Sequence, residues 1–230
     1  MIASVHIADV GARAALGVTR KAPKAGSIDG LRHADVGLAA PLRGGKYRPT
    51  PQPGRAALLA FWDDDAALDR FLAEHPLAAR LSGGWNVRLE PLRVFGSWPG
   101  VPDDLPRARV VPHDGPAAVL TLGRVKLGRV VPFYRTSGKA ERAVADAPGL
   151  IWATGLAKPP FVATCSLWDS SDALRSYAYG GEGAGHPNAI AAQHAKPFHH
   201  ESAFIRFRPY DSHGALDGRN PLAGTWSHAG

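Results

Sequence analysis

The chain has 230 residues, a formal net charge of +7 and one cysteine. Apolar residues make up 45% of it and charged residues 20%, a globular composition that excludes a disordered chain. The lone Cys165 excludes an intramolecular disulfide framework and a cysteine-rich metal site. No run approaches the roughly 18 apolar residues of a membrane span, and the first residues lack a signal-peptide pattern. We therefore expect a cytoplasmic protein.

The basic residues are scattered in ones and twos, without a basic run or the aromatic-basic motif of RNA-binding proteins. This pattern argues against nucleic acid as a partner. A basic surface suits an acidic redox partner or the carboxylates of a cofactor equally well.

Taken in chain order, the first half contains an apolar run at residues 56–62 that ends in Trp62-Asp63. A helix-like segment follows and leads to His75-Pro76, and residues 87–95 form a further strand. Residues 97–113 are rich in proline and read as a connector.

The second half repeats this order. A strand begins at Ala117, a helix over residues 139–147 stops at Pro148-Gly149, and residues 150–153 form a short strand. The run 161–168 again ends in Trp-Asp. One of three residues then caps a helix that ends at Tyr179, before a last strand at 203–210; the candidate caps are Asp169, Ser170 and Ser171.

Further matches lie in the same order: residues 37–41 parallel 155–159, and His75-Pro76 parallels His186-Pro187. Chance similarity of alanine-rich segments is the alternative. Strand, helix, strand, strand, helix, strand is the ferredoxin-like unit, so the predicted class is α+β with a tandem duplication. The predicted parts of one compact unit are residues 1–96, the connector 97–113, the second repeat 114–210 and a tail, 211–230.

The halves differ before His186, where the glycine-rich stretch 180–185 lengthens the second half. At a helix N-terminus the imidazole of His186 should be neutral and free to bind a metal; the alternative is a helix cap, as for His75. Nearby imidazoles fit no zinc spacing, although one of them could donate a proton; they are His194, His199 and His200.

Two other features have alternative interpretations. Cys165 occupies an alternate position within an apolar strand, and it is predicted to be a core residue, not a thiolate ligand. Arg124, Lys126 and Arg129 could bind the carboxylates of a cofactor or substrate, or they could be solvated charges at a sheet edge.

Several segments of the second half resemble the spheroidene monooxygenase family. These are Thr-x-x-Arg followed by a basic residue at 121–126, Ser-x-Trp at 166–168, Ala-Tyr…His…Ala-Ile across 178–190, and Asp-Gly-Arg-Asn-Pro-Leu at 217–222. The resemblance implies a dimeric-α/β-barrel-like fold, a b-type haem and oxygen insertion into a hydrophobic substrate. It also places the family histidine at His186, as the axial iron ligand. The long glycine-rich stretch and Phe198-His199-His200 depart from the family pattern, so a carotenoid substrate is not assumed.

The leading hypothesis is thus a haem monooxygenase that uses dioxygen and a ferredoxin-type electron donor. Candidate propionate anchors are Arg124, Lys126, Arg129 and Arg135, and candidate donors to bound oxygen are His199, His200 and Arg206. A homodimer is one of the open oligomeric states. The alternatives are a non-oxidative haem enzyme of the aldoxime-dehydratase type and a binding module for haem or another small ligand without turnover.

Overall fold

The structure is a computed structural model that describes residues 1–42, 52–108, 111–126, 128, 144–179 and 199–225, without the side chains of Pro41 and His199. Its first half contains β1 (Ile2–Asp9), α1 (Ala12–Arg20), β2 (Leu31–Pro41), β3 (Arg55–Trp62), α2 (Asp65–Glu74), α3 (Pro76–Leu81) and β4 (Trp85–Gly96). Its second half contains β5 (Ala117–Val125), β6 (Leu150–Lys158), β7 (Phe161–Trp168), α5 (Ser171–Tyr179) and β8 (His199–Gly214).

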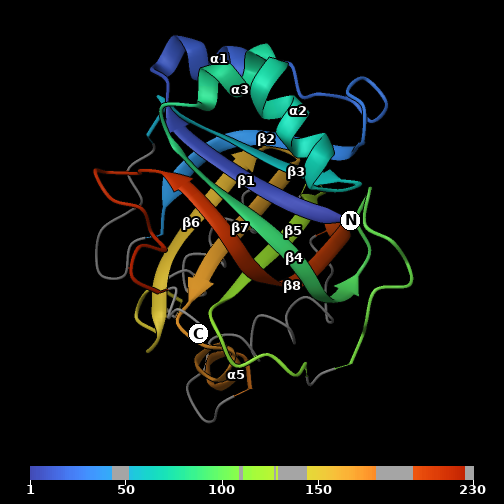
Figure 1. The fold of residues 1–230 in the computed structure, drawn as a ribbon, viewed down its shortest axis with the longest axis vertical. Coiled ribbons are helices and arrows are strands. Elements are labelled where there is room, and N and C mark those ends of the chain that lie inside the picture. Colours follow the sequence, from blue (N-terminus) through green and yellow to red (C-terminus); the bar gives the residue numbers. More distant parts are fainter. Residues whose placement is uncertain (43–51, 109–110, 127, 129–143, 180–198, 226–230) are drawn as a thin grey trace.

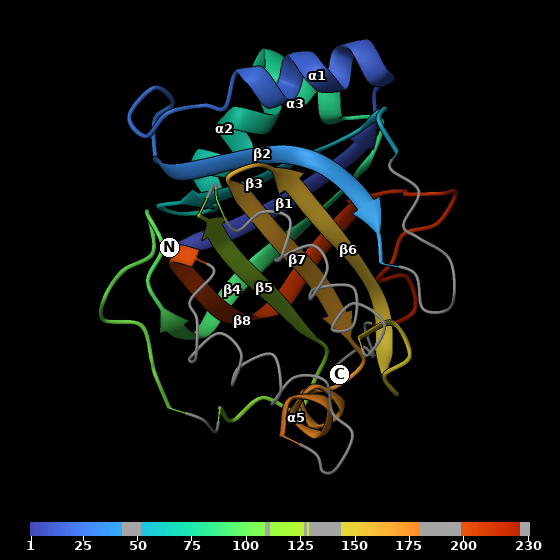
Figure 2. The ribbon, with the colours of Figure 1, turned by 180° about the vertical axis from the view of Figure 1, so that it is seen from behind.

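The described strands form one closed barrel in the order β1-β3-β2-β6-β7-β5-β8-β4 (Figures 1 and 2). Strands β1 to β4 have the order 4-1-3-2 of a ferredoxin-like unit, and β5 to β8 have the corresponding order 8-5-7-6. The halves join through two antiparallel pairs, β2 with β6 and β4 with β8. The predicted mixture of helices and strands in a barrel is therefore confirmed, whereas the domain boundaries stay a prediction.

The predicted strand at residues 161–168 has the bounds of β7, but the last strand is longer than predicted. It begins at His199 and ends at Gly214. The predicted start at residue 203 is therefore wrong, because His199 and His200 already belong to the strand. The cause is tertiary, because β8 pairs with β5 from Val125 onward and with β4 as far as Trp85.

Alternate side chains of the strands fill the barrel interior, as the two-residue period of a strand requires. Among the buried members are Val5, Leu59, Trp85, Leu120 and Ile205. The segment after β8 adds Leu216 and Leu222 to this core. The described part of the predicted tail, 211–230, thus contributes to the barrel core.

The helices lie on opposite sides of the barrel, with α1, α2 and α3 together on one side and α5 on the other (Figures 1 and 2). The first three helices cover the outer face of β1 to β3 with a second core that contains Leu58, Trp62 and Phe71. Helix α5 contributes Leu174 to a smaller cluster with Ala117 and Trp168. No helix in the described part of the chain is long and apolar enough to cross a membrane.

Corresponding turns precede β2 and β6. Gly30 and Gly149 both have positive φ, 73° and 79°, and a Cβ on either would lie 2.3 or 2.4 Å from the Cβ of an alanine in the following helix. Each carbonyl accepts a hydrogen bond of 2.9 Å from the backbone N–H of an aspartate, Asp63 or Asp169. Only glycine fits both the backbone angle and the space.

Helix α5 begins as the sequence predicts. The hydroxyl of Ser170 accepts a hydrogen bond of 3.1 Å from the Ala173 N–H, so Ser170 is the cap among the three candidates. The predicted helix at residues 139–147 falls mostly outside the described residues, of which 144 and 145 are helical.

Candidate functional site

The outer face of β5 to β8 carries small side chains in rows that cross the sheet. One row runs from Gly155 through Thr164 and Thr121 to Phe204, because these residues are paired in register across β6, β7, β5 and β8. Register partners in antiparallel strands project to the same face, and the adjacent side chains along each strand belong to the barrel core. All four residues of the row are half-buried.

The corresponding face of the first half is closed. Leu58 and Trp62 of β3 and His6 of β1 are buried beneath α2 and α3. In the described part of the second half, helical cover is concentrated near Ala117 and Trp168. The row through Thr121 and Thr164 is therefore the flat, partly accessible surface, and backbone can approach a planar ligand closely where side chains are this small.

Arg206 lies on this same face, one row closer to α5. It pairs in register with Val119, which pairs with Ser166. Arg206 is 9% exposed, and a guanidinium brought this far from water needs polar partners. Of the predicted donors to bound oxygen, Arg206 is thus the one with a described side chain within this face.

The other two predicted donors lie at the start of β8. His200 is exposed, and His199 belongs to the strand although its side chain is outside the description. His200 lies six positions before Arg206 in β8, a separation of about 20 Å at roughly 3.3 Å per residue. His200 and Arg206 therefore cannot be equivalent donors to a single oxygen atom.

Arg124 points into the barrel, on the side of Leu120 and Leu122. Its Nε donates to Glu201 at 3.1 Å, and its Nη2 lies 3.4 Å from an oxygen of Asp35. Its guanidinium also stacks 4.7 Å from the centre of the Trp98 ring. The side chain predicted as a propionate anchor is therefore held in an internal network.

Asp35 is the centre of that network, although no motif in the sequence singled it out. Its carboxylate is 8% exposed and accepts a hydrogen bond of 3.0 Å from Trp98 Nε1, with His33 Nε2 at 2.9 Å. The only sequence signal was an acidic residue at an inward position of a strand. Its partners come from chain positions 63 and 89 residues away.

Lys126 is half-buried and directly follows β5, so it lies outside the strand that contains Arg124. Four predicted site residues lie outside the described part of the chain: Arg129, Arg135, His186 and His194. No group of three His, Cys, Asp or Glu side chains in the described residues could hold a metal ion.

Cys165 is confirmed as a core residue. It is fully buried among inner-face side chains, and burial raises the pKa of its thiol to about 12. A thiolate at this position is strongly disfavoured, so Cys165 is not a candidate metal ligand.

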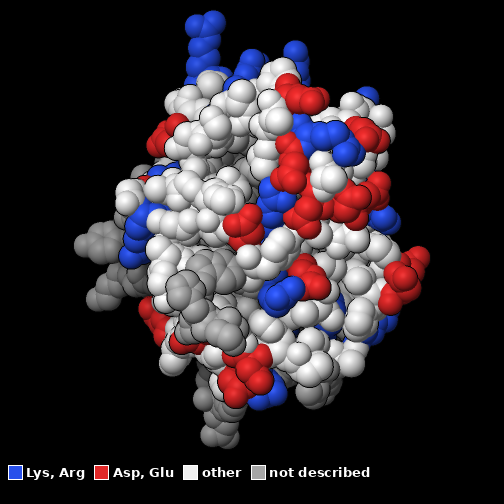
Figure 3. Space-filling view, in the orientation of Figure 1, with Lys and Arg blue, Asp and Glu red and all other residues white. Residues whose placement is uncertain are grey.

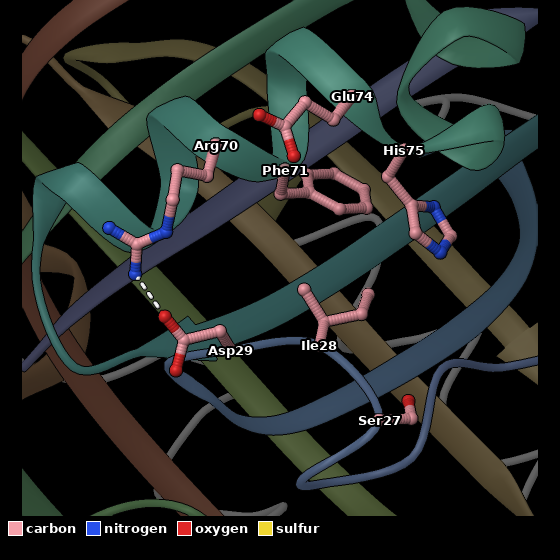
Figure 4. Close-up of a pocket in the computed structure, with 7 residues that line it drawn as sticks. All are labelled: Ser27, Ile28, Asp29, Arg70, Phe71, Glu74 and His75. Carbon is pink, nitrogen blue, oxygen red and sulfur yellow. Dashed lines mark hydrogen bonds and ion pairs between the residues drawn. The ribbon is translucent and has the colours of Figure 1, made fainter.

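A hollow of about 360 Å³ lies on the helical side of the first half, between α2 and the loop before β2 (Figure 4). Four of its five polar side chains already have partners, and the fifth, Glu74, is exposed. Arg70 pairs with Asp29 at 2.6 Å, and the Ser27 hydroxyl donates to the Lys24 carbonyl. His75 Nδ1 accepts from the Leu77 N–H and caps α3, as expected. We therefore do not assign the hollow as the candidate site.

Acidic and basic side chains are interspersed on the face of the molecule in Figure 3, without a continuous basic surface. Arg88 exemplifies this, because it pairs with Asp65, Asp69 and Asp211. On that face the basic residues behind the net charge of +7 therefore do not form a surface that could bind a polyanion.

Comparison with known proteins reveals three relatives named spheroidene monooxygenase. The protein from Rubrivivax gelatinosus is 32% identical over 181 residues, which cover 76% of this chain and 68% of that protein. The protein from Rhodobacter capsulatus is 27% identical over 184 residues, 77% of this chain and 76% of that protein. The protein from Cereibacter sphaeroides is 25% identical over 182 residues, 76% and 56% of the two chains. No protein-family model matches the chain.

Two solved structures of aldoxime dehydratases share the fold. One, in complex with butyraldoxime, has a TM-score of 0.54 at 11% identity and covers 96% of this chain and 84% of that chain. The other has a TM-score of 0.53 at 10% identity, over 96% and 86% of the chains. At these identities the likeness concerns the fold alone.

Proposed function

Because the chain belongs to the spheroidene monooxygenase family, we propose that it is a haem-dependent monooxygenase acting on a hydrophobic small molecule. Family membership makes it an oxidoreductase enzyme. The observation that carries the proposal is the 32% identity over 181 residues to a relative with that name. The likeness to aldoxime dehydratases supports the fold and does not favour the dehydratase reaction, which stays an alternative.

The described residues fit a flat prosthetic group on the outer face of β5 to β8. Thr121, Thr164 and Gly155 present little side-chain volume there, and a Cβ on Gly155 would meet only ordinary contacts, 3.5 Å from Leu42. We propose this row as the haem-binding surface, with His186 as the residue that would bind the iron. A bound haem would supply the activation of dioxygen.

The chain's own residues would have distinct tasks. Arg206, within the proposed surface, would donate a hydrogen bond toward dioxygen or substrate, and His199 or His200 would act only at the end of the face near the start of β8. Since Arg124 is engaged by Asp35 and Glu201, three other cations are the better candidates for the haem carboxylates: Lys126, Arg129 and Arg135.

Three partners follow from the proposed reaction. Dioxygen and a hydrophobic substrate are its reactants, and a ferredoxin-type protein is the proposed electron donor. A homodimer and a cytoplasmic location stay predictions. We also propose that the two halves arose by duplication, supported by the matching turns at Gly30 and Gly149 and by the corresponding strand orders 4-1-3-2 and 8-5-7-6.

An absorption titration with haem tests the proposal. We expect a Soret band in the wild-type protein and its loss or shift in His186→Ala, with no change in His213→Ala, which removes an exposed imidazole from β8. A Soret band that is unchanged in His186→Ala would mean that His194, His199 or His200 binds the iron instead. Absence of haem uptake by the wild type would refute the proposal and favour the binding module. Turnover without dioxygen would favour the dehydratase type.

A further inference from the structure

A second hollow, of about 310 Å³, lies between α1 and α3, next to the hollow in Figure 4. The two hollows share Ser27 and His75 in their walls. The other walls of the second hollow come from the end of α1, the loop that follows it, and α3. Its volume is at the lower end of the range for ligand pockets, about 300 Å³ and above, so it suits a small molecule.

Both charged side chains of the second hollow are cations. They are Lys21, directly after α1, and Arg80 of α3, and both are exposed. Neither forms an ion pair with any described residue, and no Asp or Glu belongs to the described walls of this hollow. In the first hollow, by contrast, Arg70 is paired with Asp29. The second hollow therefore offers positive charge that its own walls do not neutralise.

His75 adds a hydrogen-bond donor to the same wall. Its Nδ1 accepts from the Leu77 N–H at 3.1 Å, so the proton of the neutral ring lies on Nε2. No described residue accepts a hydrogen bond from this Nε2, and the Glu74 carboxylate points away from His75 (Figure 4). The ring is held against Phe71, with centroids 5.1 Å apart and planes at 29°. An incoming acceptor thus finds a donor that is already oriented.

The rest of the wall is mostly apolar. Val18 and Leu77 are buried in it, and Pro23 and Pro76 belong to it as well. Proline is rigid and has no backbone N–H, so these two residues present apolar surface without a competing donor. Apolar surface beside positive charge suits a ligand with an acidic group and a short apolar portion.

We propose that this hollow binds a small organic anion. Its carboxylate or phosphate group contacts Lys21, Arg80 and the Nε2 of His75, and its apolar portion contacts the two prolines. A guanidinium donates paired hydrogen bonds to either group. The site is separate from the proposed haem-binding surface, because α1 to α3 cover β1 to β3, whereas that surface lies on β5 to β8 (Figures 1 and 2). The inference therefore does not depend on the proposed function.

A diffuse cationic surface is the main alternative. Arg13, Arg20 and Lys24 are also exposed, and they form no ion pair with a described residue. A surface that attracts anions by charge alone, as on an anionic membrane, would use Arg13 as much as Arg80. A site in the hollow differs in two ways, because it depends on Arg80 and Lys21 and because an apolar portion strengthens binding.

The test is an NMR titration of the full chain with pentanoate, pentyl phosphate, acetate and inorganic phosphate. The readout is the ring C–H signals of His75, which are identified by their loss in His75→Gln. We expect a saturable shift with pentanoate or pentyl phosphate. The affinity should be about tenfold higher than for the same acidic group without the chain, because the chain is partly removed from water.

The variants separate the hollow from the surrounding surface. Arg80→Gln and Lys21→Gln should each weaken binding about fivefold, since each removes a charged donor at a partly exposed site. Arg13→Gln is the matched control, because it removes an exposed cation of α1 that does not line the hollow. It should bind as the wild type does.

Four results would overturn the inference. The first is no saturable shift of the His75 signals with either pentyl compound. The second is unchanged affinity in both Arg80→Gln and Lys21→Gln. The third is equal weakening in Arg13→Gln, which would indicate the diffuse cationic surface. The fourth is equal affinity with and without the pentyl chain, which would mean an adventitious ion only.

Discussion

Acid lability of the barrel is predicted from one buried histidine, His6 of β1. The imidazole is 3% exposed, and its Nε2 lies 2.9 Å from the Ser4 hydroxyl, which accepts a hydrogen bond from Trp62 Nε1. Burial, together with the positive charge of Arg88, lowers the pKa of His6 from 6.5 to about 4. The ring is therefore neutral in the folded protein at neutral pH.

The pKa difference fixes the sign and the size of the effect. Between pH 6.5 and about 4 the unfolded chain binds a proton at His6 that the folded chain does not. The free energy of unfolding must therefore fall as the pH drops through this window. At roughly 1.4 kcal/mol per pKa unit, the full loss attributable to His6 is about 3 kcal/mol.

Urea unfolding of the wild type and of His6→Gln, from about pH 7.5 to about pH 4, measures this loss. The variant has no titrating group at position 6, so its stability should fall less with acid, by about 3 kcal/mol over the whole range. His200→Gln, which removes an exposed imidazole, should keep the wild-type slope. Parallel curves for wild type and His6→Gln would refute the reasoning.

Four further substitutions test the packing. Gly30→Ala and Gly149→Ala should each destabilise by about 1–3 kcal/mol, from positive φ and steric overlap; wild-type melting curves would contradict this. Asp35→Ala should cost about 2–3 kcal/mol, measured by urea unfolding, because it removes the acceptor of the Trp98 indole N–H; a neutral result would mean that the network is dispensable. Leu222→Ala, at a fully buried position of the tail, should cost about 2–5 kcal/mol in the same assay, whereas a loss near zero would show that the tail does not support the core.

The candidate site illustrates the limits of a local reading. Leu120, Leu122 and Arg124 occupy every second position, so in a strand they project to the same face. The two leucines indicate that this face belongs to the core. We interpreted Arg124 by its charge, as a cofactor anchor or a solvated residue. The structure pairs it with Asp35 and Glu201 on the inner side of the barrel, where neither interpretation had placed it.

The sequence by itself determined the class of the fold, the bounds of β7, the start of α5 to within three candidate caps, the core position of Cys165 and the family. These depend on residue period, capping chemistry and shared motifs, which act over a few neighbouring positions. Only the tertiary structure decided that Asp35 meets Arg124 across 89 residues, and that Phe95 lies beside Phe204. Such contacts depend on the register of strands distant in the chain, and a slip of one residue would turn each side chain to the opposite face.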